Sequence, residues 1–161
     1  MNDFYRELSD RIRGTISDLD RIVERIARAW ARALEASDDQ DAYLDSTALN
    51  LHGFYSGLER LFEIIARQVD EDVPAGETWH RDLLLQMARD LPDLRPAVIS
   101  EDNAAALDEF RRFRHLVRNV YTINIVPAKM SRIVSVLPDL WTKLRAELSA
   151  FADFTVDLAA Q

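Results

Sequence analysis

The chain has 161 residues, of which 48% are hydrophobic, and its formal net charge at pH 7 is -8. This length suits a single domain over residues 1–161 that buries roughly two-thirds of its unfolded surface, and the scarcity of glycine favours helices. The absence of cysteine excludes disulfides and thiolate metal sites, and the acidic balance disfavours a general nucleic-acid coat, which needs broad positive charge.

The location of the protein is predicted from its termini and its apolar runs. The charged first residues lack the apolar centre of a signal peptide. No uninterrupted apolar run approaches the ~20 residues of a membrane span. A chain without cysteine is also compatible with a reducing compartment. We therefore expect a cytoplasmic protein with no membrane partner.

Two long amphipathic helices are predicted at the start of the chain, over residues 3–36 and 41–70. In each, apolar residues recur at steps of three and four and form one continuous stripe. The connection at 37–41 is short and consists of cap and turn formers, so the helices should be antiparallel neighbours. The stripes contain Leu8, Ile12, Ile16, Leu19, Ile22, Val23, Ile26 and Trp30 in the first helix, and Tyr43, Leu44, Leu51, Phe54, Tyr55, Leu58, Leu61, Phe62, Ile65 and Val69 in the second.

A third, shorter helix is predicted to open within residues 77–82, after an acidic loop at 70–76 that contains proline and glycine. Thr78 is its expected cap. Its apolar positions are Leu83, Leu84, Leu85, Met87 and Leu91.

His80, next to Trp79 at the start of this helix, admits two interpretations. In the first, Trp79 seals the end of the bundle, and His80 caps the helix or pairs with Asp82. In the second, His80 supplies an imidazole to a functional site and contacts RNA. The first is favoured, because nothing in the sequence places His80 beside another site.

The remaining chain is expected to form a link and two or more helical segments. Residues 91–100 contain two prolines and should be largely non-helical. Ser100 or Asp102 then caps a helix that runs to about residue 124. Pro127 begins another segment, which is interrupted or kinked around Pro138. The final helix covers 139–158 and presents Leu140, Trp141, Leu144, Leu148, Phe151, Phe154 and Leu158. The sum is an all-α, up-and-down bundle of four or five helices.

The helix that follows residue 100 reverses the sign of the charge locally. Four arginines and a histidine fall within residues 111–118 of this acidic protein. Its apolar stripe is Phe110, Phe113, Leu116, Val117 and Val120, and the neighbouring face collects Arg111, Arg114 or His115, Arg118 and Tyr121.

Two interpretations of these arginines stay open. They form ion pairs with carboxylates of neighbouring helices, as charged helix faces usually do. Alternatively they form an anion site, most naturally for phosphate, because the planar guanidinium matches phosphate oxygens and clustered arginines repel one another.

The segment 113–121 (FRHLVRNVY) resembles the signature of HEPN-superfamily proteins of the HepT-like ribonuclease toxin group. That signature is an arginine, a polar residue, three further positions, a histidine, one residue and a tyrosine. Arg114 matches the arginine, His115 the polar residue and Tyr121 the tyrosine, whereas Asn119 stands in place of the histidine. The order of a long helical hairpin, Gly-Glu-x-Trp-His, the signature and a closing Leu-Pro-x-Leu-Trp helix is similar to one HepT-like branch over nearly the whole chain.

The resemblance implies a HEPN-like fold and a homodimer, at whose interface the signature residues of two protomers meet. It implies that Arg114 holds the scissile phosphate of an RNA and that His115 orients the phosphate or the ribose. Tyr121 would receive AMP from a partner nucleotidyltransferase antitoxin, which blocks the toxin. Asn119 cannot shuttle protons, since an amide does not titrate near neutrality, but it can hydrogen-bond to phosphate or base edges.

Metal and cofactor chemistry is not expected. The three histidines lie far apart without a metal-binding spacing, and no glycine-rich phosphate loop is present. Metal-independent cleavage of RNA needs only a base for the 2′-hydroxyl, a cation for the phosphate and an acid for the leaving oxygen.

Three hypotheses follow from the sequence. The first is a toxin-type endoribonuclease that uses Arg114, His115 and Asn119, with Arg111, Arg118 and His80 as RNA contacts. The second is a non-catalytic HEPN-like protein that binds a nucleotidyltransferase and also nucleotide or RNA. The third is a helical-bundle dimer without a site. The first ranks narrowly above the second.

Overall fold

The computed structural model describes residues 2–119 and 127–161, apart from the side chains at 2, 118 and 119. The described residues form five α-helices and one π-helical segment, which confirms the all-α bundle. The helices are α1 (Asn2–Glu35), α2 (Gln40–Ile65) with its π-helical continuation η1 (Ala66–Asp70), α3 (Trp79–Met87), α4 (Glu101–Asn119) and α5 (Pro127–Ala159).

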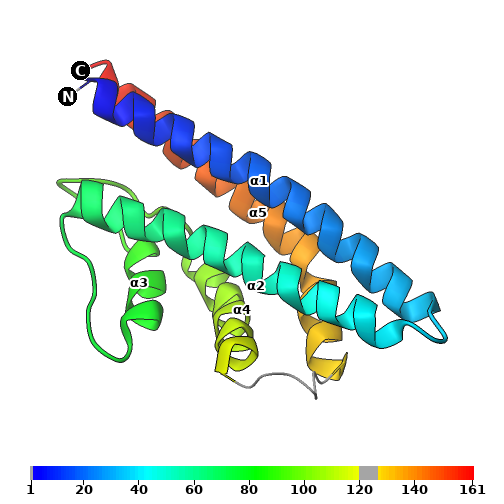
Figure 1. The fold of residues 1–161 in the computed structure, drawn as a ribbon. Helices are drawn as coiled ribbons and strands as arrows, with labels where there is room; N and C mark the ends of the chain where they lie inside the picture. Colours follow the sequence, from blue (N-terminus) through cyan, green and yellow to red (C-terminus); the bar gives the residue numbers. More distant parts are fainter. Residues whose placement is uncertain (1, 120–126) are drawn as a thin grey trace.

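The three long helices form the body of the fold. In Figure 1 the chain runs down along α1 from the N-terminus at the upper left, and returns along α2. The later helix α5 lies beside α1 and runs back toward the upper left, so that the two termini lie at the same end. The apolar stripes predicted for α1 and α2 meet in this body, where Leu8, Ile12, Phe54 and Phe62 are almost completely buried. Burial of these stripes stabilises helices that would be marginal in isolation.

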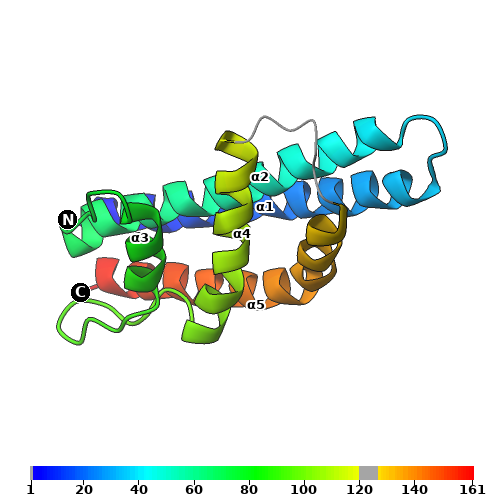
Figure 2. The same cartoon turned by 90° about the horizontal axis from the view of Figure 1, so that it is seen from below.

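The two shorter helices run across the long ones rather than beside them. Figure 2 shows α3 and α4 crossing the direction of α1, α2 and α5. α4 packs its apolar side against α2, where Phe110 lies close to Phe54 with a ring separation of 5.6 Å. This crossing brings the middle of α2, the start of α3 and the charged half of α4 to one side of the molecule.

Pro138 does not interrupt the last helix. α5 is continuous from Pro127 to Ala159, so the predicted start of a final helix at residue 139 is wrong. The helix does bend where it passes from gold to orange, the stretch that contains Pro138 (Figures 1 and 2). Proline removes one N–H from the helix, but Leu137 and Leu140 are buried on either side of it and keep both halves packed on the same core.

The start of α4 is fixed by a carboxylate from α5. Ser100 is the cap, as predicted: its Oγ accepts a hydrogen bond from the Asn103 backbone N–H at 3.2 Å. Glu147 accepts hydrogen bonds from the backbone N–H of Ser100 and from the side-chain amide of Asn103. A carboxylate at a helix N-terminus satisfies otherwise unpaired N–H groups and suits the helix dipole.

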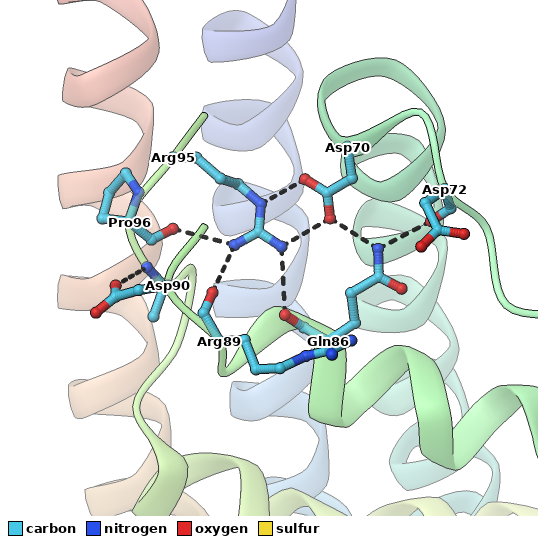
Figure 3. A network of polar contacts seen from close by, with 8 residues as sticks. Asp70, Asp72, Gln86, Arg89, Asp90, Arg95 and Pro96 are labelled. Atoms are coloured by element: carbon cyan, nitrogen blue, oxygen red, sulfur yellow. Dashed lines mark hydrogen bonds and ion pairs between the residues drawn. The ribbon is translucent and has the colours of Figure 1, made fainter. Parts of the chain in front are cut away.

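A buried polar network ties the non-helical link to the end of η1 (Figure 3). The Arg95 guanidinium contacts both oxygens of Asp70, at 2.5 and 2.7 Å. It also donates to the backbone carbonyls of Gln86, Arg89 and Pro96. The Gln86 side chain completes the network by donating to Asp70 at 2.7 Å, so the C-terminal end of α3 is held against η1.

Several predicted helix boundaries and apolar stripes are confirmed, but two residues of the predicted stripes are more exposed than expected. The link at 91–100 is non-helical, as predicted. Leu85 is half exposed because it lines an open hollow of about 530 Å³ between α3 and α4, and Leu116 lies at the edge of the α4 stripe and is partly exposed. Within residues 2–119 and 127–161, no helix has the length and apolar character needed to cross a membrane.

Candidate active site

The site is built on one face of α2. Ser56 and Glu59 lie three residues apart, so they project from the same side of the helix toward α3 and α4. The Glu59 side chain is only 4% exposed. A carboxylate this deep in the protein needs charged or hydrogen-bonding partners, because burying an unpaired charge is very costly.

The first partner of this carboxylate is Arg114 of α4. One terminal nitrogen of Arg114, Nη1, forms an ion pair with Oε1 of Glu59 at 3.2 Å. The Nε–H of Arg114 donates a hydrogen bond to Oγ of Ser56 at 2.9 Å. The guanidinium, whose side chain is 15% exposed, is therefore held at two points by α2. Its other terminal nitrogen, Nη2, makes no hydrogen bond or ion pair with the described residues.

The second partner is His80 at the start of α3. Its Nδ1 lies 2.8 Å from Oε2 of Glu59, the carboxylate oxygen that Arg114 does not use. The Trp79 ring stacks on the imidazole, with centroids 3.6 Å apart and planes inclined by 29°. The stacking and the hydrogen bond together fix the plane of the ring, whose side chain remains 23% exposed.

The favoured sequence interpretation of His80 is thus partly wrong. Trp79 does pack against the core, but His80 pairs with Glu59 and not with Asp82. The Asp82 carboxylate instead accepts a hydrogen bond from the Thr78 hydroxyl at 2.8 Å. Thr78 occupies the predicted cap position, but this hydroxyl makes no cap hydrogen bond to the backbone.

The ion-pair interpretation is confirmed for the three arginines of this cluster whose side chains the structure describes, and the anion site stays a prediction. Asp108, one turn earlier in α4, contacts Nε of Arg111 at 2.7 Å and Nε of Arg112 at 3.2 Å. These are local helix ion pairs of the ordinary kind. Arg114 differs from both because its partner is a buried carboxylate on another helix.

The remaining predicted residues lie beyond this cluster or outside the described part of the structure. His115 is an exposed residue of α4. Arg118 and Asn119 are its last two described positions, and their side chains are outside the described residues. Tyr121, the predicted modification site, lies outside them as well. The structure thus brings together Arg114 and His80.

The comparison with protein families decides the identity of the chain. A family model described as HepT-like protein matches residues 46–155, which is more than half of the sequence. The chain belongs to the HepT-like family. The matched range contains α3 and α4 entirely and includes Ser56, Glu59, His80 and Arg114. No curated protein and no solved structure matches this chain.

Family membership supports a toxin-type HEPN protein. Ser56 and Glu59 are the site residues that the sequence analysis missed. Glu59 carried a usable signal, because it lies four residues after Tyr55 and three before Phe62, on the apolar stripe of α2. A charged residue on a buried stripe predicts a buried partner.

In this HepT-like chain, the cluster also borders a buried phenol. The pKa of the Tyr55 hydroxyl is raised above its ordinary value, chiefly because the side chain is buried, and secondarily because the negative charge of Glu59 opposes ionisation; Arg111 and Arg114 act in the opposite direction. Tyr55 therefore remains a neutral hydrogen-bonding group under physiological conditions. Among the described residues, no group of three or more His, Cys, Asp and Glu is arranged to hold a metal ion.

A pH prediction follows from Tyr55. Because its folded-state pKa is raised, the unfolded chain releases this proton first, and the stabilisation present below about pH 10 is lost as the pH rises further. Urea unfolding of Tyr55→Phe between pH 9 and 11.5 should therefore show a shallower decline than wild type, by up to about 1.4 kcal/mol per pH unit. Equal slopes in the two proteins would contradict this assignment.

Proposed function

We propose that this HepT-like protein is the toxin of a toxin–antitoxin pair, a metal-independent endoribonuclease that acts as a homodimer and is neutralised by a nucleotidyltransferase antitoxin. The observation that carries the proposal is the fixed Arg114 side chain. Ser56 and Glu59 hold Nε and Nη1, which leaves Nη2 to donate to an RNA phosphate.

A guanidinium held in this way suits stabilisation of the transition state. Donors that are oriented before the reaction lower the barrier more than donors that must reorganise. Arg114 pays little conformational entropy when phosphate binds, because its side chain is already restrained by α2. The planar guanidinium can contact Ser56 and Glu59 with two nitrogens while the third donates to phosphate, which a lysine ammonium cannot do in the same geometry.

The other proposed RNA contacts lie along the same helix. His115 follows Arg114 and would orient the phosphate or the ribose, and Arg111 lies one turn before Arg114 on α4. Arg118 and Asn119, one turn further, would hydrogen-bond to the RNA backbone or base edges. The small size of this site reconciles RNA binding with a net charge of -8, since only a few phosphates are engaged.

The test is cleavage of total RNA and of a tRNA pool by the purified protein in EDTA, beside Arg114→Ala. Cleavage by wild type alone supports the proposal. A synthetic substrate with 2′-O-methyl ribose should resist cleavage, because a reaction without metal uses the 2′-hydroxyl as nucleophile. Cleavage that is lost in EDTA but restored by a divalent ion would contradict the metal-independent mechanism.

The presence of Asn119 in place of the signature histidine favours a second candidate, a non-catalytic HEPN-like protein that binds a nucleotidyltransferase and also nucleotide or RNA. An amide does not titrate near neutrality, so Asn119 cannot act as a general acid or base. This candidate predicts that folded wild-type protein binds RNA with Arg114-dependent affinity but does not cleave it. Gel-shift and cleavage assays on the same samples separate the two candidates.

Tyr121 gives the prediction that concerns the antitoxin. Incubation with ATP and the cognate nucleotidyltransferase should add one or more adenylate units to the protein, detected by intact mass. Tyr121→Phe should abolish the gain, because phenylalanine lacks the hydroxyl that accepts the adenylyl group. Tyr43→Phe, on α2, is the matched control and should be modified like wild type. Modification that persists in Tyr121→Phe would place the target elsewhere.

A further inference from the structure

The two carboxylate oxygens of Glu59 contact different residues. Oε1 faces Arg114 of α4 at 3.2 Å, and Oε2 faces His80 of α3 at 2.8 Å. Glu59 thus joins residues that are 34 positions apart (114 minus 80) and lie on different helices. Its own side chain is almost completely buried, so solvent does not compete for either oxygen.

We infer that His80 is the imidazole that works with Arg114 in RNA cleavage, and that Glu59 is the residue that positions both of them. This inference rests on the proposed ribonuclease function, and it supplies the proton-transfer group that Asn119 cannot provide. It adds a second helix to the site and makes the start of α3 part of the catalytic surface.

The hydrogen bond from Glu59 determines which ring nitrogen of His80 is basic. An ionised carboxylate can only accept, so the neutral imidazole must place its proton on Nδ1 to make this bond. Nε2 then carries the lone pair and can accept a proton. Among the described residues, Nε2 has no recorded hydrogen bond. Partial exposure of the ring leaves it accessible to a substrate.

The reaction then balances with groups of this chain, the RNA and water. Nε2 of His80 takes the proton of the ribose 2′-hydroxyl while O2′ forms a bond to phosphorus. Arg114 donates from Nη2 to a non-bridging phosphate oxygen and stabilises the added negative charge. The P–O5′ bond breaks, and O5′ takes a proton from water. The products are a 2′,3′-cyclic phosphate and a 5′-hydroxyl, and the imidazolium returns its proton to solvent.

Glu59→Gln is the sharpest test of the positioning role. The amide oxygen of glutamine must face the Arg114 donors, because the opposite orientation would place two donors against each other. Its NH₂ group then faces His80 and donates to Nδ1, which moves the imidazole proton to Nε2. The residue keeps its shape and most of its contacts, while Nε2 loses the lone pair needed for catalysis.

We expect Glu59→Gln to lower kcat by at least about a hundredfold, the usual contribution of a general base, with a much smaller change in KM. Glu63→Gln, one turn further along α2, is the matched control and should keep wild-type kcat. Glu59→Gln that folds and retains wild-type kcat would overturn the positioning role. Circular dichroism and thermal unfolding establish the fold of each variant.

His80→Ala tests the imidazole itself. It should lose kcat to a similar extent, and added imidazole should restore part of the cleavage because a small molecule can occupy the vacated position. In the Glu59→Gln background, His80→Ala should lower kcat only slightly further, since both changes remove the same basic nitrogen. Wild-type kcat in His80→Ala would overturn the inference.

A spectroscopic measurement separates failure of this inference from failure of the ribonuclease proposal. In ¹⁵N spectra recorded where His80 is neutral, the wild-type ring should carry its proton on Nδ1, and Glu59→Gln should carry it on Nε2; His80→Ala assigns the signals. An unchanged tautomer overturns the positioning role even if RNA is cleaved. The predicted switch in a protein that cleaves no RNA would overturn the ribonuclease proposal and keep the role of Glu59.

Discussion

Arg114→Ala is expected to lower the kcat for RNA cleavage by about 10²–10³-fold, the effect of removing one oriented donor to a developing oxyanion. The variant removes the guanidinium that Ser56 and Glu59 hold in place. It should also abolish growth inhibition when the protein is expressed in cells. Helical content and dimer mass should remain, because Phe110 and Phe113 keep α4 in the core and His80 still pairs with the buried Glu59 carboxylate.

Arg112→Ala is the matched control for this experiment. Arg112 lies two residues earlier on the same helix, its side chain is 65% exposed, and its ion pair is local, with Asp108. It should therefore cleave RNA at nearly the wild-type rate. Arg114→Lys should keep the charge beside Glu59 but lose the planar fork, and it should be intermediate in kcat. Equal cleavage by Arg114→Ala and wild type would remove this arginine from the mechanism.

Much of the fold was predictable because its main signals are local in the sequence. The stripes of α1 and α2 follow from steps of three and four residues, and their ends follow from cap and turn formers. The last five residues of the second predicted helix are present as the π-helical segment η1. The continuity of α5 through Pro138 was harder to predict, since it depends on burial on both sides of the proline.

The site was only half predictable, for a physical reason. The signature pointed to Arg114. The match of the family model to residues 46–155 confirms the resemblance to the HepT-like family. The neighbour of Arg114, however, is determined by how α3 and α4 cross α2, and no local pattern encodes that crossing. His80 was therefore expected to pair within its own helix, although the structure places it on the carboxylate of Glu59.

The structure also links the stability of the fold to the geometry of the site. α3 is attached to the α2–η1 rod at both ends, by His80 on Glu59 and by Gln86 on Asp70. A helix of nine residues is too short to be stable alone, so its position depends on these attachments and on its buried leucines. Loss of the hydrogen bond between Gln86 and Asp70 should therefore also shift the His80 imidazole at the other end of α3.

The largest loss of stability is expected for Arg95→Ala, at about 3–5 kcal/mol of unfolding free energy. The Arg95 side chain is 0% exposed and that of Asp70 is 2% exposed, so the variant would leave a buried carboxylate without its cation. Urea denaturation monitored by circular dichroism measures the change. Arg13→Ala is the matched control, because its pair with Asp153 is exposed at 48% and 71%, and such pairs contribute about 0–1 kcal/mol.

The double variant Arg95→Met with Asp70→Leu tests whether charge pairing alone explains this loss. Replacing a buried ion pair by apolar residues of similar volume is often neutral. Here the guanidinium also donates to three backbone carbonyls. The Gln86 carbonyl keeps the Arg89 backbone N–H, but those of Arg89 and Pro96 would lose this donor, at about 1–3 kcal/mol for each group left unsatisfied. The double variant should therefore remain well below wild type in stability. Recovery to the wild-type urea midpoint would show instead that the link folds without these hydrogen bonds.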